Sequence, residues 1–361
     1  MQHKQDLSYN LIGLMSGTSL DGLDICNVTF SRINNNWTHE IIHCRTITYP
    51  KNIFNKLKKS FSLSGIELLF LDKELGDFFG NSVNDFIEYY KIEKATIDAI
   101  ASHGHTIFHQ PDKGLTVQIG CGTSINAITG IKTINDFRKK DVVFGGQGAP
   151  LVPIGDQLLF AQFADSFLNI GGFANFSKLK NDNSITAFDI CPANIVINHF
   201  TREIGQEFDR DGKIASSNEI DYSLLEKLNN IPIYKDTRPS SLGLEWVENH
   251  FYTVLNSTNT STETNIATIT EHIAIQIANR LNASESKNVF ITGGGAKNLF
   301  LIERIKTHFN GTVTIPSEQT IDFKEALIFA FLGVLFLENI PNCLPSVTGA
   351  RKSVVGGVLH Q

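Results

Sequence analysis

Residues 13–24 combine glycines, hydroxyl side chains and two carboxylates between two apolar segments. Glycines allow a turn with positive φ and let a ligand approach the backbone closely. Hydroxyls and successive N–H groups in such a turn can bind an anion. Asp21 and Asp24 would repel a phosphate unless a cation lay between them, so the stretch suggests nucleotide phosphate with a divalent metal. An ordinary hairpin turn uses the same residue types, and both interpretations stay open at this point.

Two further glycine-rich turns follow expected strands. They are formed by Gly171 and Gly172, and by Gly293, Gly294 and Gly295, and the second precedes an expected helix. The N-terminal amides of a helix favour a phosphate or a polar ribose group. The sequence contains no GxxxxGK[ST], GxGxxG, HExxH or GxSxG motif, so ATP would be held by another kind of loop. Three such turns at strand ends favour a nucleotide.

Asp189 is the carboxylate best placed for chemistry. It follows the apolar segment 185–188 and lies just before Pro192, and proline disfavours helix in the residue before it. We therefore expect its side chain at a strand end, facing a cleft. The alternative from residue type alone is that Asp189 caps the helix expected a few residues later.

Two polar clusters have no obvious structural purpose. Histidines at i and i+2 of a strand share a face, so a metal site is one interpretation of the first cluster. No Cys or carboxylate completes that site nearby, and we favour no metal ligation there. The clusters are His103, His105 and His109 with Thr106, and Asp136, Arg138 and Asp141.

One succession of elements is expected twice. Three meandering strands are followed by helices and strand–helix units, and a glycine-rich turn follows the first strand each time. This predicts duplicated α/β domains facing each other across a cleft, with ligands beyond the carboxyl ends of the strands. The asparagine run at 34–36 and Asn-Asp-Asn at 181–183 would form equivalent turns. Expected strands cover 11–16, 23–33, 40–48, 97–102 and 115–119, then 167–170, 175–179, 185–188, 289–292 and 313–315; 298–308 and 322–338 are expected helices.

Composition narrows the class of protein. A chain of 361 residues with 42% hydrophobic and 19% charged residues is typical of a globular protein of two domains. A net charge of −6 and the lack of long basic runs argue against nucleic acid as a partner. Five scattered cysteines favour a reduced cytoplasmic compartment over disulfides or zinc. No signal peptide or membrane span is expected, so we expect no membrane partner.

Taken together, the motifs resemble those of the anhydro-N-acetylmuramic acid kinases. Each block is modest alone, but the ordered set is specific and spans residue 13 to about 351. The matching blocks are 17–24, 102–111, 136–138 running to Asp141, 145–153, 169–172, 293–298 and 344–350.

The resemblance implies two actin-like (ribonuclease H-like) domains around a central ATP and sugar cleft. We place them at 1–134, completed by 343–361, and at 135–342. The implied reaction phosphorylates O6 of 1,6-anhydro-N-acetylmuramic acid with ATP while water opens the anhydro bridge, in cell-wall recycling. It also implies Mg²⁺ with ATP and a homodimer.

Roles carried over by the same matching place Asp189 as the base. The ATP site would comprise Gly17, Thr18, Ser19, Leu20, Asp21, Gly22, Leu23, Asp24, Gly171, Gly172, Gly293, Gly294, Gly295 and Asn298, with Mg²⁺ near Asp21 and Asp24. The sugar would contact His105, Thr106, Asp136, Arg138, Asp141 and Glu325. The planar fork of Arg138 suits the lactyl carboxylate.

The chain departs from the family pattern at two places. His105 stands where typical members carry Gln, and Ile190-Cys191-Pro192-Ala193 stands where they read Thr-Gly-Pro-Gly. Loss of the glycines would restrict how closely the backbone approaches the phosphates. The leading hypothesis is the kinase just described; the alternatives are a kinase for another sugar and a non-catalytic actin-like ATP-binding protein.

Overall fold

The computed structural model describes residues 7–180, 184–235 and 242–361, which form two compact units. The first unit contains the described residues up to Leu159 together with Phe323–Gln361, and the second contains those from Phe160 to Asp322. The chain therefore passes between the units at 159/160 and 322/323, whereas the sequence placed the divisions at 134/135 and 342/343. Residues 135–159 join the first unit because their partners lie there, as the Thr348 hydroxyl that donates to Asp141 shows.

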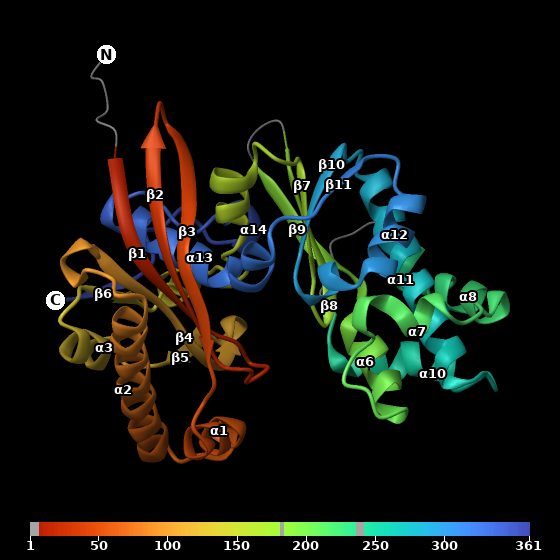
Figure 1. Ribbon diagram of the computed structural model, residues 1–361, viewed down its shortest axis with the longest axis horizontal. Helices are drawn as coiled ribbons and strands as arrows, with labels where there is room; N and C mark the ends of the chain where they lie inside the picture. The colour runs from red at the N-terminus through yellow and green to blue at the C-terminus, as the bar shows by residue number, and fades with distance from the viewer. Residues whose placement is uncertain (1–6, 181–183, 236–241) are drawn as a thin grey trace. The chain divides into compact units, whose positions relative to one another are not determined.

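In the described chain, the first unit contains a seven-stranded sheet (Figure 1). Its order is β12-β6-β4-β1-β2-β3, with β5 paired to β4. The first three strands form an antiparallel meander, and β4 and then β6 add in parallel beside β1. The strands are β1 (Leu7–Ser16), β2 (Leu23–Ile33), β3 (Asn36–Ile47), β4 (Ala99–Gln110), β5 (Leu115–Ile119), β6 (Thr133–Asn135) and β12 (Val358–His360).

Among its described residues, the second unit repeats this arrangement in a five-stranded sheet of order β11-β10-β7-β8-β9. Again three strands form an antiparallel meander, and two strands add in parallel beside the first of them. The predicted duplication of an α/β unit is confirmed by this shared strand order. The strands are β7 (Ser166–Ile170), β8 (Phe173–Leu179), β9 (Ile185–Pro192), β10 (Asn288–Thr292) and β11 (Thr312–Thr314).

Helices cover both faces of the first sheet. Helix α2 begins at a capping box between Ser64 and Glu67 and buries side chains at helical spacing, including Leu75 and Phe79. On the other face, α13 crosses β1 so closely that a Cβ at Gly13 would lie 1.9 Å from the carbonyl oxygen of Ala326. The helices are α1 (Lys51–Lys58), η1 (Ser60–Ser62), α2 (Gly65–Tyr90), η2 (Lys94–Thr96), η3 (Pro111–Lys113), α3 (Gly122–Thr129), α4 (Lys139–Val143), α5 (Pro153–Gly155), η4 (Asp156–Phe160), α13 (Glu318–Leu337) and α14 (Pro345–Thr348).

The core of the second unit forms between its sheet and the long helix α11, which is buried along most of its length. The bidentate ion pair of Arg304 with Glu271 joins α12 to α11, with 2.6 and 2.8 Å between paired atoms. The helices are α6 (Asn194–Glu203), η5 (Arg210–Gly212), α7 (Lys213–Ser216), α8 (Tyr222–Asn229), η6 (Pro232–Lys235), α9 (Leu244–Trp246), η7 (Val247–Phe251), α10 (Tyr252–Leu255), α11 (Thr262–Ala283), η8 (Gly294–Lys297) and α12 (Leu299–His308).

Several strands extend further than the sequence predicted, among them β1, which begins at Leu7, and β3, which begins at Asn36. Strand β4 continues to Gln110, so the histidine cluster lies inside it, and β9 continues to Pro192, so Asp189 lies within a strand. Strand β8 begins earlier, at Phe173. The predicted turn at 181–183 lies outside the described residues, whereas Asn34 and Asn35 have positive φ angles of 50° and 68° at the equivalent turn.

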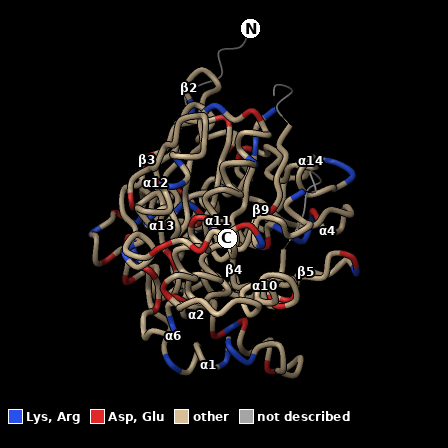
Figure 2. The backbone as a smooth tube through the Cα atoms, turned by 90° about the vertical axis from the view of Figure 1, so that its right-hand side faces the viewer, with Lys and Arg blue, Asp and Glu red and all other residues tan. Residues whose placement is uncertain are grey.

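Basic and acidic residues are scattered over the backbone rather than gathered in one stripe (Figure 2). All five cysteines are free thiols. In the part of the chain that the structure describes, none of the helices combines the length and the apolarity needed to cross a bilayer.

Candidate functional site

The loop that joins β1 to β2 contains the predicted first phosphate site. The Leu20 N–H donates to the Gly17 carbonyl over 3.2 Å, and Leu20 itself has a φ of 63°. Asp24 lies in β2, where it pairs with Met15 of β1 and with Thr46 of β3. The Thr46 hydroxyl donates to Oδ1 of Asp24 over 2.6 Å. Asp21 is exposed within the loop, so the two carboxylates have different surroundings.

A buried polar network anchors the beginning of this loop. The Ser16 hydroxyl lies 2.5 Å from the Tyr49 hydroxyl and 2.8 Å from Nδ1 of His105. Burial raises the pKa of Tyr49 to about 12 and lowers the pKa of His105 to about 4. Both side chains are therefore neutral near pH 7. His105, predicted to contact the sugar, is only 4% exposed and contacts the residue immediately before Gly17.

His103 and His105 have different neighbours. Gly104 has a φ of 74°, which interrupts the alternation of the strand between them. The His103 ring packs against Phe329 of α13, at 4.6 Å between ring centroids, and accepts from Arg138. Among the described residues no group of three or more His, Cys, Asp and Glu side chains could hold a metal ion. The interpretation that His103 and His105 share a face of the strand is wrong, because the positive φ of Gly104 turns the chain between them.

Arg138 is held from two sides. Its Nε donates to Nε2 of His103 over 3.0 Å, and its Nη1 donates to the Gly148 carbonyl over 2.8 Å. Burial lowers the pKa of Arg138, and the nearby negative charge of Glu325 opposes part of that shift. A guanidinium has five N–H donors, so these two contacts leave donors for a further acceptor. The arrangement is suited to binding a carboxylate.

Asp136 and Asp141 have separate structural partners. Asp136, with a φ of 58°, forms an ion pair with Lys139 at 3.0 Å. Asp141 is fully buried and accepts from the Gly148 N–H and the Thr348 hydroxyl, each over 2.8 Å. Asp141 therefore joins α4, the 145–148 loop and α14. Of the other predicted sugar residues, Thr106 accepts from Gln118 over 3.3 Å, and Glu325 belongs to α13.

The second and third glycine turns converge in the second unit, at the carboxyl ends of the parallel neighbours β7 and β10. The Gly171 and Gly172 carbonyls accept from Asn194 and Ala193 at the beginning of α6, over 3.1 and 2.8 Å. Gly293 has a φ of 83°, and a Cβ there would lie 2.5 Å from Oδ1 of Asn169 and 2.7 Å from the Ile170 carbonyl oxygen. Only glycine therefore fits at 293 without displacing the end of β7.

Asn298, predicted to lie against adenosine, is the N-cap of α12. Its Oδ1 accepts from the Leu301 N–H over 2.9 Å, and its own N–H donates to the Gly295 carbonyl over 3.1 Å. The side chain thus ties the third glycine turn to the first turn of the helix.

Asp189 does not cap a helix. Helix α6 begins at Asn194, and its N-cap is Ala193, which makes no side-chain capping bond. Instead, Asp189 accepts on Oδ1 from the amide of Asn175 and on Oδ2 from the Leu242 N–H, the latter over 2.8 Å. The alternative role as a helix cap is excluded.

The residues that depart from the family pattern after Asp189 point inward. Cys191 and Ala193 are fully buried in the apolar core of the second unit, and Ala193 has a φ of −127°. Both side chains pack into this core.

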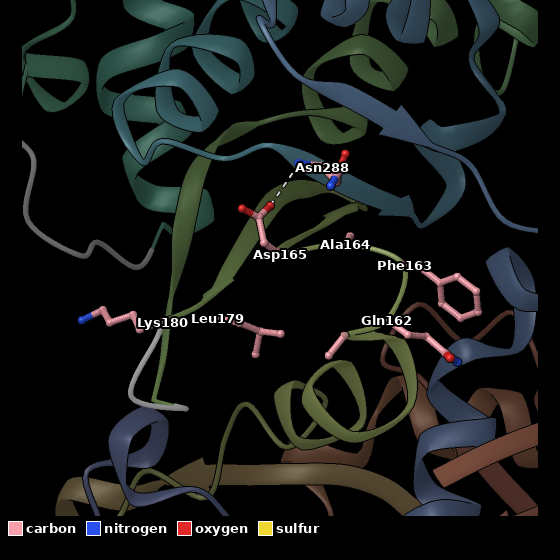
Figure 3. A pocket seen from close by; sticks show the side chains of 8 residues that line it. Gln162, Phe163, Ala164, Asp165, Leu179, Lys180 and Asn288 are labelled. Carbon is pink, nitrogen blue, oxygen red and sulfur yellow. Dashed lines mark hydrogen bonds between the residues drawn. The ribbon is translucent and has the colours of Figure 1, made fainter. Parts of the chain in front are cut away.

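A pocket of about 310 Å³ lies at the amino ends of β7 and β10, opposite to the ends that carry the glycine turns (Figure 3). Asp165 precedes β7 and accepts from the N–H of Asn288, the first residue of β10, over 3.1 Å. Phe163, Leu179 and Lys180 also line this pocket. None of the predicted site residues lines it.

Several residues of these networks were missed from the sequence: Tyr49, Asn175 and Thr348. Ser16 was predicted only as one of the hydroxyl donors of residues 13–24. Each acts through a contact between positions far apart in the chain, such as Ser16 with His105 or Asp141 with Thr348. Strand register, which the sequence pattern does not provide, is the signal that could have found Asn175, because it lies directly opposite Asp189.

The comparisons with known proteins decide the family. The family model for anhydro-N-acetylmuramic acid kinase matches residues 9–361. The chain belongs to the anhydro-N-acetylmuramic acid kinase family. The predicted family and kinase class are thereby confirmed, and the match favours this function over the other two hypotheses.

Curated relatives match over nearly their full length. The anhydro-N-acetylmuramic acid kinase of Shewanella amazonensis is 37% identical, with 96% of this chain and 97% of the relative covered. The enzyme of the same name from Pseudomonas savastanoi pv. phaseolicola is 32% identical, with 98% and 100% covered. Among solved structures, component A of Acidaminococcus fermentans (R)-2-hydroxyglutaryl-CoA dehydratase covers 89% of this chain and 96% of its own, at 13% identity and a TM-score of 0.44. A likeness this distant adds nothing to the fold argument.

Proposed function

We propose that this protein phosphorylates O6 of 1,6-anhydro-N-acetylmuramic acid with ATP while water opens the anhydro bridge. The products are N-acetylmuramic acid 6-phosphate and ADP. The observation that carries the proposal is the family match across residues 9–361. The duplicated sheets, with glycine turns after β1, β7 and β10, support a nucleotide-binding kinase.

The proposed chemistry at the sugar uses Asp189 as general base. Water attacks the anomeric carbon, its proton passes to a carboxylate oxygen of Asp189, and the bond from that carbon to O6 breaks. The released O6 then attacks the γ-phosphorus of ATP, and ADP leaves. Two hydrogen-bond donors on different oxygens of Asp189 support this role because they fix the carboxylate's orientation. General-base help of this kind contributes roughly 10²–10⁴ in rate.

The residues proposed for ATP binding come from both units. The loop 17–24 would hold phosphate in the first unit. Gly171, Gly172 and the 293–295 turn would do so in the second, with Asn298 toward adenosine. The convergence of the second-unit turns at the ends of β7 and β10 supports this assignment, because ligands of α/β sheets bind there.

Mg²⁺ would bind through ATP phosphates with Asp21 and Asp24 or their waters. One or two carboxylates plus phosphates and water is the usual Mg²⁺ environment, and it fits one aspartate in the loop and one at the beginning of β2. When bound, the ion would neutralise charge that develops on the transferring phosphoryl group.

The proposed sugar contacts come from the first unit. Arg138, with donors beyond those used by His103 and Gly148, would bind the lactyl carboxylate, and Glu325 lies near enough to interact with its charge. Asp136 and Thr106 remain predicted contacts. His105 and Asp141 are both buried, so they would support the sugar site indirectly rather than contact the sugar.

A coupled ADP-release assay tests the proposal, with mass spectrometry of the sugar product. The parent should turn over the anhydro sugar, and Asp189→Asn should lower kcat by about 10²–10⁴. The amide introduced at position 189 can keep both hydrogen bonds if the amide of Asn175 rotates, so the variant should fold normally. Turnover only on another sugar would show that the protein is a kinase with a different substrate. Nucleotide binding without turnover on any sugar would show that the protein is a non-catalytic ATP-binding protein.

Two wider predictions go with this function: a homodimer and a cytoplasmic location. Exposed apolar side chains at one end of α2 support a surface for a second copy, because contiguous exposed apolar residues often mark interfaces. Ile66, Leu69 and Phe70 are 60%, 66% and 68% exposed. Light scattering of the parent and of Leu69→Glu should give a dimer and a monomer, and a monomeric parent would overturn this prediction.

A further inference from the structure

A row of three polar side chains crosses the second sheet near its glycine turns. Asn169 of β7 lies opposite Asn175 of β8, which in turn lies opposite Asp189 of β9. Phe188, just before Asp189, packs with the apolar core, as do Ala174 and Phe176 on either side of Asn175. Since successive residues of a strand face opposite sides, Asp189 projects from the face away from that core.

Both carboxylate oxygens of Asp189 have a donor from a different part of the chain. The Nδ2 of Asn175 donates to Oδ1, and the backbone N–H of Leu242 donates to Oδ2 over 2.8 Å. One donor on each oxygen restricts rotation of the carboxylate about its own axis as well as the tilt of the side chain.

We propose that Asn175 is a positioning residue for Asp189. Its amide holds the carboxylate in the one orientation from which it can take the proton of the attacking water. This inference rests on the proposed function, in which Asp189 is the base, and Asn175 acts through Asp189 rather than on the substrate.

An amide is well suited to this task. It donates a hydrogen bond but does not exchange a proton near neutral pH, so it orients the base without competing for the proton that the base receives. The corresponding row of the first sheet uses the same device with donor and carboxylate on exchanged strands: the Thr46 hydroxyl, also uncharged, donates to Asp24 over 2.6 Å.

Two matched variants test the inference. Asn175→Thr keeps a donor of the kind that Thr46 supplies to Asp24, and Asn175→Val has nearly the same shape and strand propensity without that donor. We expect Asn175→Val to lower kcat by about 10²-fold, the loss that a misplaced catalytic group typically causes, with little change in either KM. Asn175→Thr should recover at least tenfold of that loss, roughly the value of one hydrogen bond.

The control is Ser177→Ala, which removes a polar group two residues along the same strand and should leave kcat unchanged. Unfolding temperatures are measured for all variants. Equal kcat for Asn175→Thr and Asn175→Val, or a loss confined to unfolding temperature, would overturn the positioning role. If the parent itself fails to turn over the sugar, or Asp189→Asn retains activity, the proposed function fails instead.

Discussion

The two sheets share one strand order but place their carboxylate on different strands. In the first unit the row across the meander is Met15, Asp24 and Thr46, with the carboxylate on the middle strand β2. In the second the row is Asn169, Asn175 and Asp189, with the carboxylate on the outer strand β9. Each carboxylate accepts from an uncharged side chain on the neighbouring strand.

The difference shows how one duplicated scaffold can serve two tasks. A carboxylate at the beginning of β2 lies next to the glycine loop, where phosphate and its metal ion are expected. The carboxylate on β9 instead accepts a hydrogen bond on its second oxygen from the Leu242 N–H. In both units the topology provides the row, and the strand that carries the charge determines what it can reach.

Exchanging the side chains of Asn175 and Asp189 in the second sheet should have the largest effect on kcat. In the double variant that combines Asn175→Asp with Asp189→Asn, the new amide on β9 donates to the new carboxylate on β8 and still accepts from the Leu242 N–H. The charge thereby moves to the middle strand, as in the first unit. We expect kcat to fall by about 10²–10⁴ with an unfolding temperature close to that of the parent. Retained activity would show that the strand carrying the charge does not matter.

The buried histidines of the two units predict a pH dependence of stability. Burial lowers the pKa of His105 to about 4 and that of His272 to about 3, so both are neutral in the folded chain. The unfolded chain takes up these protons first, below pH 6.5, so stability is lost as pH falls from there toward 4. His105 contributes on the order of 3 kcal/mol to this loss.

His105→Gln should remove that part of the slope while His272 keeps its own. Gln also offers polar atoms to the Ser16 hydroxyl, which contacts His105 in the parent. Urea unfolding at pH 7.5, 6 and 5, followed for parent and variant, measures the difference. An unchanged slope in the variant would mean that His105 is not held neutral by the first unit.

The glycine turns of the two units should differ in their tolerance of a side chain. Gly293→Ala forces a Cβ to within 2.7 Å of two atoms of β7 at a φ of 83°, whereas a Cβ at Gly17 meets its nearest neighbour, Ser19, at 3.5 Å. We expect Gly293→Ala to destabilise the chain by about 1–3 kcal/mol and Gly17→Ala by less than half as much. Denaturant midpoints of the two variants test this, and equal losses would contradict it.

The smallest expected effect concerns the row of Met15, Asp24 and Thr46 across the first sheet. Thr46→Val removes the hydroxyl that donates to Asp24. If Asp24 acts with Mg²⁺, the KM for MgATP should rise by about fivefold, which corresponds to roughly 1 kcal/mol, while the KM for the sugar stays the same. Initial rates at varied MgATP and fixed sugar give the comparison, and a change confined to the sugar KM would assign Asp24 to the other substrate.

Local sequence signals predicted the elements well. Alternating apolar residues and asparagine or glycine turns located most of the strands, and the repeated succession revealed the duplication. The ends of β4 and β9 were missed because His103–His109 and Asp189 are polar where a strand pattern would be apolar. Pairing with β5 and β8 extends these strands regardless of their polarity.

The candidate site was predicted in residue identity but not in contacts. His105 and Asp141 were selected by family matching, yet their partners Ser16 and Thr348 lie 89 and 207 positions away in the chain. Such contacts depend on strand register and helix packing, which no local pattern encodes. The same is true of the Leu242 N–H, a backbone group whose role is independent of its side chain.

The discontinuity of the first unit has a consequence for synthesis of the chain. Strand β12 pairs with β6, and Thr348 donates to buried Asp141, so the first unit needs residues made after the whole of the second. A ribosome adds roughly 5–20 residues per second, so the loop 145–148 waits on the order of ten seconds or more for its last partner. During that interval Asp141 lacks its α14 contact. The nascent first unit is then the part of this protein most exposed to misfolding, and a chain released before Thr348 would never close it.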